Sequence, residues 1–309
     1  MKGENMLDCL AIGEVMAELR RDVNGDFSVG FAGDTFNTAV YCRRALGASG
    51  SVAYMTRLGL DPLSYSAEAL ARSEDLNTEF IERTEQAQIG IYSVATDDQG
   101  ERSFSYWRDR SAARGLFADA SSHVLLPKAR IVYLSGITLA IMPSDARQRL
   151  MDALEGLSKS GSALVAFDSN YRPALWEDVE TARAVMRHMW DIADIALPSL
   201  DDELALFGES DEAAVFERFS RGSWTACAIK RGEKGPVSPN LNSDALPEFR
   251  PASKVHDTTA AGDSFNGGYL AAFLRGEGEA TCLLAGHDLA SQVVQYPGAI
   301  VCADAIAKG

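Results

Sequence analysis

The residues whose types and spacing most suggest chemistry lie in one twelve-residue segment, Asp257–Gly268, which reads DTTAAGDSFNGG. Its small residues leave backbone N–H groups open to a ligand, and a small, apolar helical pattern follows. Because the start of a helix carries unpaired N–H donors and partial positive charge, phosphate is the anion expected there. Asp263 would stand beside that anion, where a carboxylate can take a proton from a hydroxyl attacking phosphorus. A helix start capped by Asp263, with no ligand, is the plainer alternative.

This segment resembles the carboxy-terminal signature of the ribokinase-like sugar kinases, the phosphofructokinase B family, whose usual pattern is Asp-Thr-x-Gly-Ala-Gly-Asp. In that family the last aspartate is the catalytic base and the Gly-Ala-Gly amides form an anion hole. The resemblance therefore implies that Asp263 is a base and that the amides of Ala260, Ala261, Gly262 and Asp263 hold the phosphoryl group. Ala260 replaces the first glycine, which is acceptable only if the backbone there needs no positive φ.

The whole chain limits the possible classes of protein. Its 309 residues fit one large α/β domain over 1–309 or two smaller ones, and we expect the single domain. A net charge of −15, spread along the sequence, argues against nucleic acid or an anionic membrane as partner. The five cysteines are widely spaced without a Cys-x-x-Cys pair, which indicates a reducing compartment. With no apolar run long enough for a signal peptide or a membrane span, we expect a cytoplasmic protein.

The elements that must position these residues alternate between strands and helices. Six strand-like runs are each followed by a helical pattern. The strand-like runs are 7–13, 51–58, 131–134, 163–168, 195–197 and 225–230, and the helical patterns are 35–46, 62–73, 144–158, 181–192, 201–207 and 263–294. Residues 235–253 are expected to carry short strands and loops. This repetition predicts an α/β fold that is doubly wound around a mainly parallel sheet.

Two further segments, about 14–32 and 88–108, read as β-hairpins and do not fit that alternation. They predict a small β-sheet lid over the core. The resemblance implies the same, since ribokinase-like enzymes carry such a lid over the sugar. In many relatives the lids of two subunits pack together, so a homodimer through the lid is expected.

The resemblance also implies where the sugar binds. The segments around Tyr92, Tyr106 and Asp168 look specifically like those of the 2-keto-3-deoxygluconate kinases of this family. The residues expected at the sugar are Gly33, Asp34, Asn37, Tyr92, Tyr106, Arg108, Ile137, Asp168, Arg172 and Asp263. Without the family, plainer interpretations are open. Asp34 would be part of a helix cap, Arg108 a solvated arginine on an edge strand, and Asp168 a turn residue at the end of a strand. Because arginine offers a planar pair of donors to a carboxylate, Arg108 and Arg172 favour a keto-deoxy sugar acid over fructose or ribose.

The nucleotide is expected beside the basic turn that begins at Lys230. This turn resembles the family's Lys-x-Gly-x-x-Gly motif near the ATP phosphates, although a solvated charged turn is the alternative. The resemblance implies ATP contacts from Lys230, Gly232, Gly235, Thr258, Ala261 and Gly262. Asp202 stands where the family's Asn-x-x-Glu carries its glutamate, which implies a contact to Mg²⁺ through water.

These implications together predict ATP-dependent phosphorylation of 2-keto-3-deoxygluconate to its 6-phosphate. Two alternatives stay open at this point. One is a kinase of a neutral sugar, such as fructose or ribose, on the same fold. The other is a sugar-acid sensor without catalysis, against which the presence of Asp263 argues.

Overall fold

The central feature of the computed structural model is a seven-stranded sheet of order β11-β10-β9-β8-β1-β4-β5. Every neighbouring pair in it is parallel. Its strands are β1 Leu7–Ile12, β4 Val52–Leu58, β5 Ile81–Arg83, β8 Ala129–Ser135, β9 Leu164–Asp168, β10 Ile195–Ala196 and β11 Ala226–Cys227. The structure describes residues 6–21, 25–96, 102–119 and 124–306. The predicted α/β fold with a mainly parallel sheet is confirmed.

The chain leaves the middle of this sheet in both directions, which makes the fold doubly wound. From β1 it passes to β4 and β5 on one side, whereas β8, β9, β10 and β11 follow one another on the other side. The order therefore reverses between β1 and β8. In open α/β sheets, ligands bind at the carboxyl ends of the strands near such a reversal.

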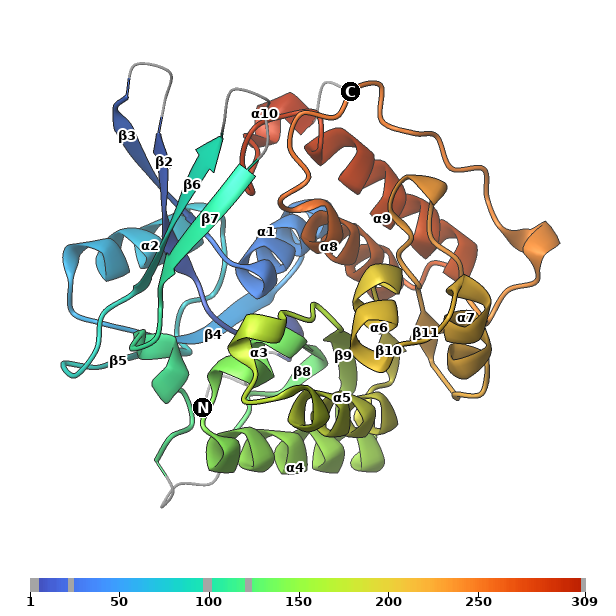
Figure 1. Ribbon diagram of the computed structural model, residues 1–309, viewed down its shortest axis with the longest axis horizontal. Coiled ribbons are helices and arrows are strands. Elements are labelled where there is room, and N and C mark those ends of the chain that lie inside the picture. Colours follow the sequence, from blue (N-terminus) through green and yellow to red (C-terminus); the bar gives the residue numbers. More distant parts are fainter. Residues whose placement is uncertain (1–5, 22–24, 97–101, 120–123, 307–309) are drawn as a thin grey trace.

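A second, four-stranded sheet of order β3-β2-β6-β7 forms what we call the lid. Its strands are β2 Met16–Arg21, β3 Phe27–Ala32, β6 Gly90–Thr96 and β7 Arg102–Trp107. The hairpins β2–β3 and β6–β7 are antiparallel and join through a parallel pairing of β2 with β6. Both hairpins fall within the segments predicted for them. The polar stretch 97–100, which the sequence predicts as the turn of the second hairpin, lies outside the described residues. The lid stands to one side of the core (Figure 1).

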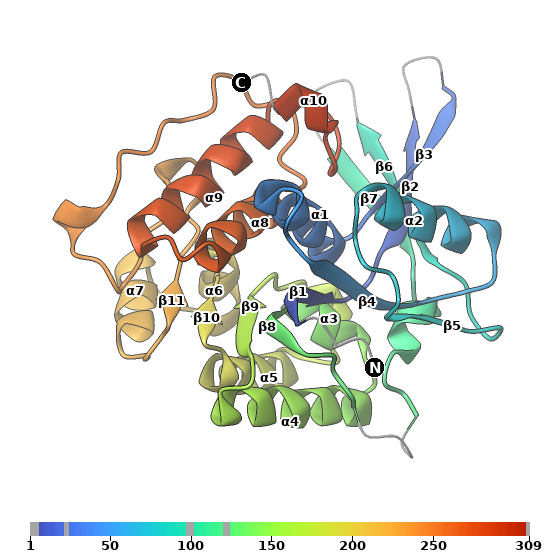
Figure 2. The same cartoon turned by 180° about the vertical axis from the view of Figure 1, so that it is seen from behind.

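Helices cover both faces of the main sheet (Figures 1 and 2). One face carries α3 Gly136–Ile141, α4 Ser144–Ser160, α5 Val179–Ile192, α6 Leu200–Phe207 and α7 Glu212–Ser220. The other carries α1 Asp34–Leu46, α2 Pro62–Ser73, α8 Ala261–Leu274 and α9 Glu279–Val293. A last short helix, α10 Ala303–Ile306, lies near the lid (Figure 1). No helix within the described ranges is long and apolar enough to cross a membrane.

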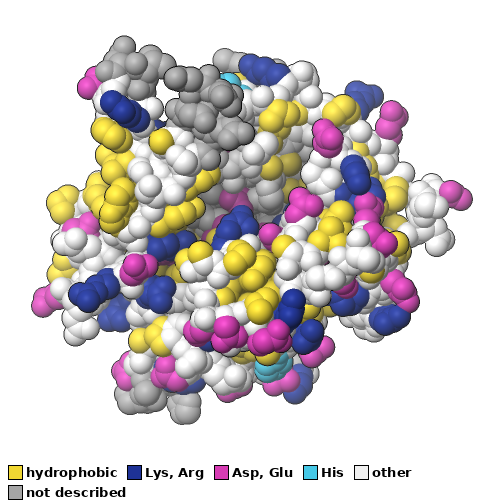
Figure 3. Space-filling model, viewed as in Figure 1, with side chains coloured by type: hydrophobic (Ala, Val, Ile, Leu, Met, Phe, Trp, Pro, Cys, Tyr) yellow, Lys and Arg dark blue, Asp and Glu magenta, His cyan; other side chains and the backbone are white. Residues whose placement is uncertain are grey.

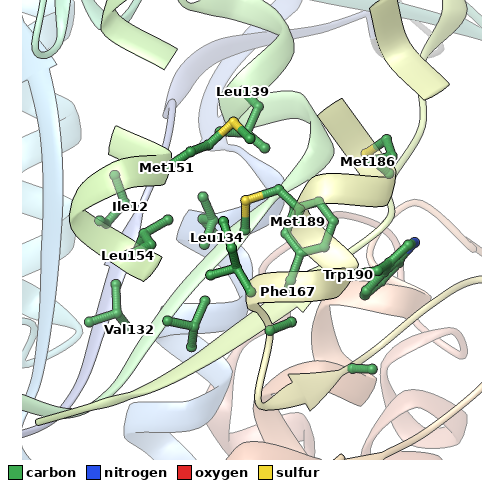
Figure 4. Packing of buried hydrophobic residues seen from close by; sticks show 14 of the residues in the cluster. Ile12, Val132, Leu134, Leu139, Met151, Leu154, Phe167, Met186, Met189 and Trp190 are labelled. Carbon is green, nitrogen blue, oxygen red and sulfur yellow. The ribbon is translucent and has the colours of Figure 1, made fainter. Parts of the chain in front are cut away.

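Alternating side chains of the strands supply a separate hydrophobic core to each face. On β8, Val132 and Leu134 belong to the core under α4 and α5, while Ile131 and Tyr133 belong to the opposite core. Figure 4 shows the first of these cores, with Trp190 of α5 close to Phe167 of β9. Their rings meet edge to face with centroids 4.8 Å apart.

Local sequence explains where several helices begin and end. The Asp61 carboxylate accepts a hydrogen bond from the Ser64 N–H at 2.9 Å, and Pro62 follows as the first residue of α2. Asp178 caps α5 in the same way. Helix α4 ends at Gly161, whose φ of 64° lies in the left-handed region that glycine tolerates.

The structure corrects the sequence prediction at the edges of the main sheet. The strand predicted over 225–230 is only Ala226–Cys227, because Ile229 pairs instead with Val237 in an isolated antiparallel bridge. Apart from that bridge, residues 235–253 contain a 3-10 turn, Ser243–Ala245, and no strand. The sequence patterns also do not predict β5, α7 or α10; of these, β5 and α10 are too short for a clear periodicity.

Candidate active site

A cavity of about 660 Å³ opens at the carboxyl ends of the strands. Its walls come from the ends of β9 and β10, the basic turn after β11, the start of α8 and one side of α9. Figure 3 shows the molecule hollowed near its centre, with acidic and basic side chains around the hollow. Of the residues predicted from the sequence, those lining the cavity are Asp168, Arg172, Asp202, Lys230, Gly232, Thr258, Ala261, Gly262 and Asp263.

The start of α8 presents two free backbone donors to this cavity. The N–H of Ala261 donates to the Thr258 carbonyl at 3.1 Å, so it is engaged in the turn. The N–H groups of Gly262 and Asp263 have no acceptor within the described part of the chain. Ala260 precedes the helix with φ −113°, a conformation open to any residue, which explains why alanine can replace glycine there. Of the amides that the sequence predicts for an anion hole, that of Ala261 therefore already has a partner in the turn.

Asp263 lies in the first turn of α8 and is mostly buried. Its Oδ2 accepts a hydrogen bond from Asn37 Nδ2 of α1 at 2.8 Å. Burial, followed by the charge of Asp34, raises the pKa of Asp263 to about 8, although the Asn37 contact lowers it. A carboxyl group with a pKa near neutrality is suited to exchange a proton with a substrate hydroxyl.

A second carboxylate, Asp168 at the end of β9, is held by two partners. Its Oδ1 forms an ion pair with Lys230 Nζ at 2.8 Å, and its Oδ2 accepts from Asn266 Nδ2 at 2.6 Å. Asn266 Oδ1 in turn accepts from Lys230 at 3.2 Å. Both side chains of the ion pair are largely buried. This network fixes the Lys230 ammonium beside the start of α8, where a Cβ on Gly262 would lie 3.8 Å from Nζ.

Asp34, at the start of α1, forms the third acidic position of the site. Its Oδ2 accepts hydrogen bonds from Ser135 Oγ at the end of β8 and from Asn170 Nδ2, the latter at 2.8 Å. Burial raises the pKa of Asp34, while these hydrogen bonds act in the opposite direction. Asn170 has a φ of 27°, which turns the chain after β9 back toward α1. Side chains from α1, β8 and the segment after β9 thus meet at the reversal between β1 and β8.

Asp202 of α6 lies at the edge of the cavity, 17% exposed as a side chain. It accepts hydrogen bonds from Ser169 Oγ, the Tyr171 N–H and Arg172 Nη1 at 3.2 to 3.4 Å. Burial raises its pKa, against the effect of Arg172. Within the described ranges no group of three or more His, Cys, Asp or Glu side chains could hold a metal ion. A carboxylate in this position suits Mg²⁺ that keeps its waters and binds mainly through phosphate oxygens.

The residues predicted from the lid face its inner side but do not line the cavity. Tyr92 is buried and donates to Glu18 Oε1 at 2.8 Å. Tyr106 stacks on Tyr92, with ring centroids 5.9 Å apart, and is 53% exposed. Arg108 is 5% exposed and forms an ion pair with Glu14, the second residue after β1. Arg108 and Arg172 are thus paired with different carboxylates, Glu14 and Asp202.

Six other predicted residues lie outside the cavity lining, namely Asp34, Asn37 and Ala260, described above, and Gly33, Ile137 and Gly235. Gly33 packs against Glu14, with room for no Cβ, because one would lie 2.0 Å from the Glu14 carbonyl oxygen. Gly136 contacts the Ser169 carbonyl, so the next residue, Ile137, lies beside the turn after β9. Gly235, predicted at ATP, has a φ of 75° and packs against the Phe249 ring.

Sequence reasoning omitted several residues that the structure brings into the site. Asn266 carried a readable signal, since it lies three residues after Asp263 on a helix and so shares its face. Asn170 stands between Asp168 and Arg172 in a segment that resembles the family's Asp-x-Asn-x-Arg motif, whereas Glu14 gave no such signal, because its partner Arg108 is 94 residues away. His287 lines the cavity, and its Nε2 lies 2.7 Å from the Arg250 carbonyl oxygen.

Comparison with known proteins fits this geometry. The model of the pfkB family carbohydrate kinases matches residues 6–306. The chain belongs to this family of carbohydrate kinases. Two similar relatives are named 2-dehydro-3-deoxygluconokinase: the protein of Dickeya dadantii is 39% identical, covering 94% of this kinase and 95% of the relative, and that of Escherichia coli K12 is 37% identical, covering 94% and 96%.

Solved structures share the fold at lower sequence identity. Fructokinase from Vibrio cholerae, crystallised with fructose, ADP and calcium ion, superposes with a TM-score of 0.80. It is 22% identical, and the match covers 95% of this kinase and 94% of that chain. The predicted ribokinase-like fold and sugar kinase family are thereby confirmed.

Proposed function

We propose that this protein is an ATP-dependent kinase of 2-keto-3-deoxygluconate, also called 2-dehydro-3-deoxy-D-gluconate. The observation that carries the reaction type is the Asp263 carboxyl group, buried beside two unpaired N–H groups at the start of α8. The names of the relatives at 39% and 37% identity support the sugar acid as substrate.

In the proposed reaction, Asp263 removes the proton from the terminal 6-hydroxyl of the sugar as its oxygen attacks the γ-phosphorus of ATP. The bond between the γ-phosphorus and the bridging oxygen breaks, and ADP leaves. The N–H groups of Gly262 and Asp263, with the Lys230 ammonium, donate to the charge on the transferred group. Bound Mg²⁺ supplies further neutralisation of the phosphates, and Asp202 is the carboxylate placed to reach it through water.

Arg172 is the better placed of the two arginines to bind a substrate carboxylate. Its side chain is 54% exposed and lines the cavity, and its contact to Asp202 is long, at 3.4 Å. Arg108 is buried and paired with Glu14, so only the N–H groups of its guanidinium that do not contact Glu14 would bind the substrate carboxylate, from the side of the lid. Tyr92, Tyr106, Asp34, Asn37, Ile137 and Gly33 complete the proposed sugar site, and Thr258, Gly232 and Gly235 the proposed ATP site.

A comparison of substrates tests the assignment. Arg172→Ala should lower kcat/KM for 2-keto-3-deoxygluconate roughly tenfold to a hundredfold, because one charge-assisted contact is worth about 1.5–3 kcal/mol. The same variant should turn over fructose as the wild type does, and Arg221→Ala, at a 75% exposed side chain on the far end of α7, is the matched control.

Two outcomes would replace the proposal with its alternatives. Faster turnover of fructose or ribose than of the sugar acid, unaffected by Arg172→Ala, would make the protein a neutral-sugar kinase. Tight binding of the sugar acid with no turnover of any sugar would make it a sensor.

We further propose that two copies associate through the outer face of the lid. Phe104 and Tyr106 of β7 point to the inner face with Tyr92, so Trp107 points outward. Trp107, Phe27 and Val29 are 60%, 62% and 51% exposed, an apolar surface unusual for an isolated sheet. Hydrophobic side chains over the lid are visible at the left of Figure 3.

We also assign the protein to the cytoplasm. All five cysteines are free thiols in the structure, and four of them are buried. Free thiols persist in a reducing compartment.

A further inference from the structure

A line of polar contacts crosses the lid from its inner face to its border with the core. Tyr92 of β6 donates its hydroxyl to Glu18 Oε1 at 2.8 Å. The other oxygen of Glu18 forms an ion pair with Arg20 Nη2 at 2.7 Å. Glu18 is 4% exposed, so the pair is fixed at its carboxylate end. Arg20 is thereby joined, through one buried carboxylate, to a residue that the proposed function places at the sugar.

The guanidinium of Arg20 reaches out of the lid to the segment after α9. A Cβ built on Gly298 would lie 2.8 Å from Arg20 Nη1 and 3.2 Å from Nη2, so the guanidinium lies against the glycine backbone. Gly298 has a φ of 102°, and its N–H donates to Asp257 Oδ2 at 2.7 Å. Any residue other than glycine at position 298 would have a strained backbone, and its Cβ would clash with the Arg20 guanidinium.

Asp257 then fixes the turn that leads into α8. Its Oδ1 accepts from the Thr259 N–H at 2.9 Å, and the side chain is buried. Thr258 and Thr259 line the cavity together with Gly262. Polar contacts thus join Tyr92 to Arg20 in the lid and Gly298 to the turn before α8, and between the two the Arg20 guanidinium lies against Gly298.

Electrostatics favours the charged guanidinium at this position. Burial by itself lowers the pKa of Arg20, but Glu18 and then Tyr92 and Asp257 more than offset it, so the pKa is raised. Carboxylates of the lid and of the core thus attract the same cation. A movement of the lid away from the core would separate Arg20 from the Asp257 side at an electrostatic cost.

We propose that Arg20 is a positioning residue that couples the lid to the turn before α8, so that sugar under the lid and nucleotide at the turn strengthen each other's binding. Sugar bound at the inner face of the lid keeps the lid close to the core, and Arg20 of the lid then stays packed against Gly298. Asp257, which is bonded to Gly298, keeps the turn before α8 in the conformation that binds phosphate. Because such coupling is reciprocal, it is measurable from either ligand. This inference rests on the proposed function, which supplies the two ligands.

Calorimetric titration of ADP with magnesium, with and without saturating 2-keto-3-deoxygluconate, tests the inference. In the wild type the sugar acid should tighten ADP binding at least about fivefold, the lower end of typical couplings. In Arg20→Ala the ratio of the two dissociation constants should fall to within about twofold of one, with ADP affinity in the absence of sugar retained. The neighbouring Arg21→Ala, an exposed residue on the opposite face of β2, should keep the wild-type ratio.

Two further variants show whether the coupling between sugar and ADP depends on the contacts that Glu18 makes with Tyr92 and Arg20. Tyr92→Phe removes only the hydroxyl that meets Glu18 and should reduce the ratio, and adding it to Arg20→Ala should cause no further loss. Arg20→Lys keeps a positive charge without the flat guanidinium and should give an intermediate ratio, which guards against misfolding of the alanine variant.

Three results would overturn the inference: a wild-type ratio of one, an unchanged ratio in Arg20→Ala, or loss of ADP affinity in Arg20→Ala without any sugar. Failure of the proposed function looks different. In that case the wild type neither binds nor phosphorylates the sugar acid, and the same titrations are made with the sugar that it does phosphorylate.

Discussion

Replacing Asp263 by asparagine should remove activity and raise stability in the same variant. The side chain keeps its shape, and Asn37 can still donate to the remaining carbonyl oxygen 2.8 Å away in the wild type. What disappears is an ionisable group whose pKa is raised to about 8, first by burial and then by the charge of Asp34.

The pH dependence of the stability difference follows from that pKa. An unfolded aspartate has a pKa of about 3.9, so between about pH 4 and pH 8 the folded protein holds a proton that the unfolded chain has released. Stability of the wild type therefore falls as pH rises through this window, by about 1.4 kcal/mol per pH unit from this group. The asparagine variant lacks this loss, so its stability advantage over the wild type should grow as pH rises from 5 to 7 and reach several kcal/mol.

Urea unfolding at pH 5, 6, 7 and 8, with turnover measured in parallel, provides the assay. Turnover should fall by about 10² to 10⁴, the usual contribution of a general base. Asp191→Asn, at an exposed position on α5, is the control and should change neither quantity. A stability difference that does not grow from pH 5 to pH 8 would refute the raised pKa, and unchanged turnover would refute the proposed base.

Three further predictions concern the partners of the site and the lid. Asn37→Ala removes the contact that lowers the pKa of Asp263, so the midpoint of the pH profile of kcat/KM should move to higher pH; a downward movement would contradict this. Lys230→Met leaves Asp168 without its ion pair, which should raise the KM for ATP at least about tenfold and cost about 3 kcal/mol in urea unfolding. Lys234→Met, at a 66% exposed side chain, is its control for stability. Trp107→Asp should convert a dimer to a monomer in light scattering, and a wild type that is already monomeric would exclude the lid interface.

The sequence determined the parts of this protein that are continuous along the chain. The turn at 257–263 and the start of α8 are encoded by neighbouring residues, so the candidate base and anion site could be predicted from their order alone. The alternation of strands and helices predicted the parallel sheet, and the two hairpin patterns predicted the lid. Short elements such as β5 and α10 escaped prediction, because a few residues give no measurable periodicity.

Only the tertiary structure decided which polar and charged side chains meet. Asn37 and Asp263 are 226 residues apart, and Asp168 and Asn266 are 98 apart, yet both pairs share hydrogen bonds in the site. The sequence suggested two arginines for one carboxylate, whereas the fold pairs Arg108 with Glu14 and Arg172 with Asp202. Such pairings depend on where β1, β8 and β9 end in the folded sheet, and no local pattern encodes that arrangement. The raised pKa of Asp263 has the same origin, since burial and the approach of Asp34 exist only after folding.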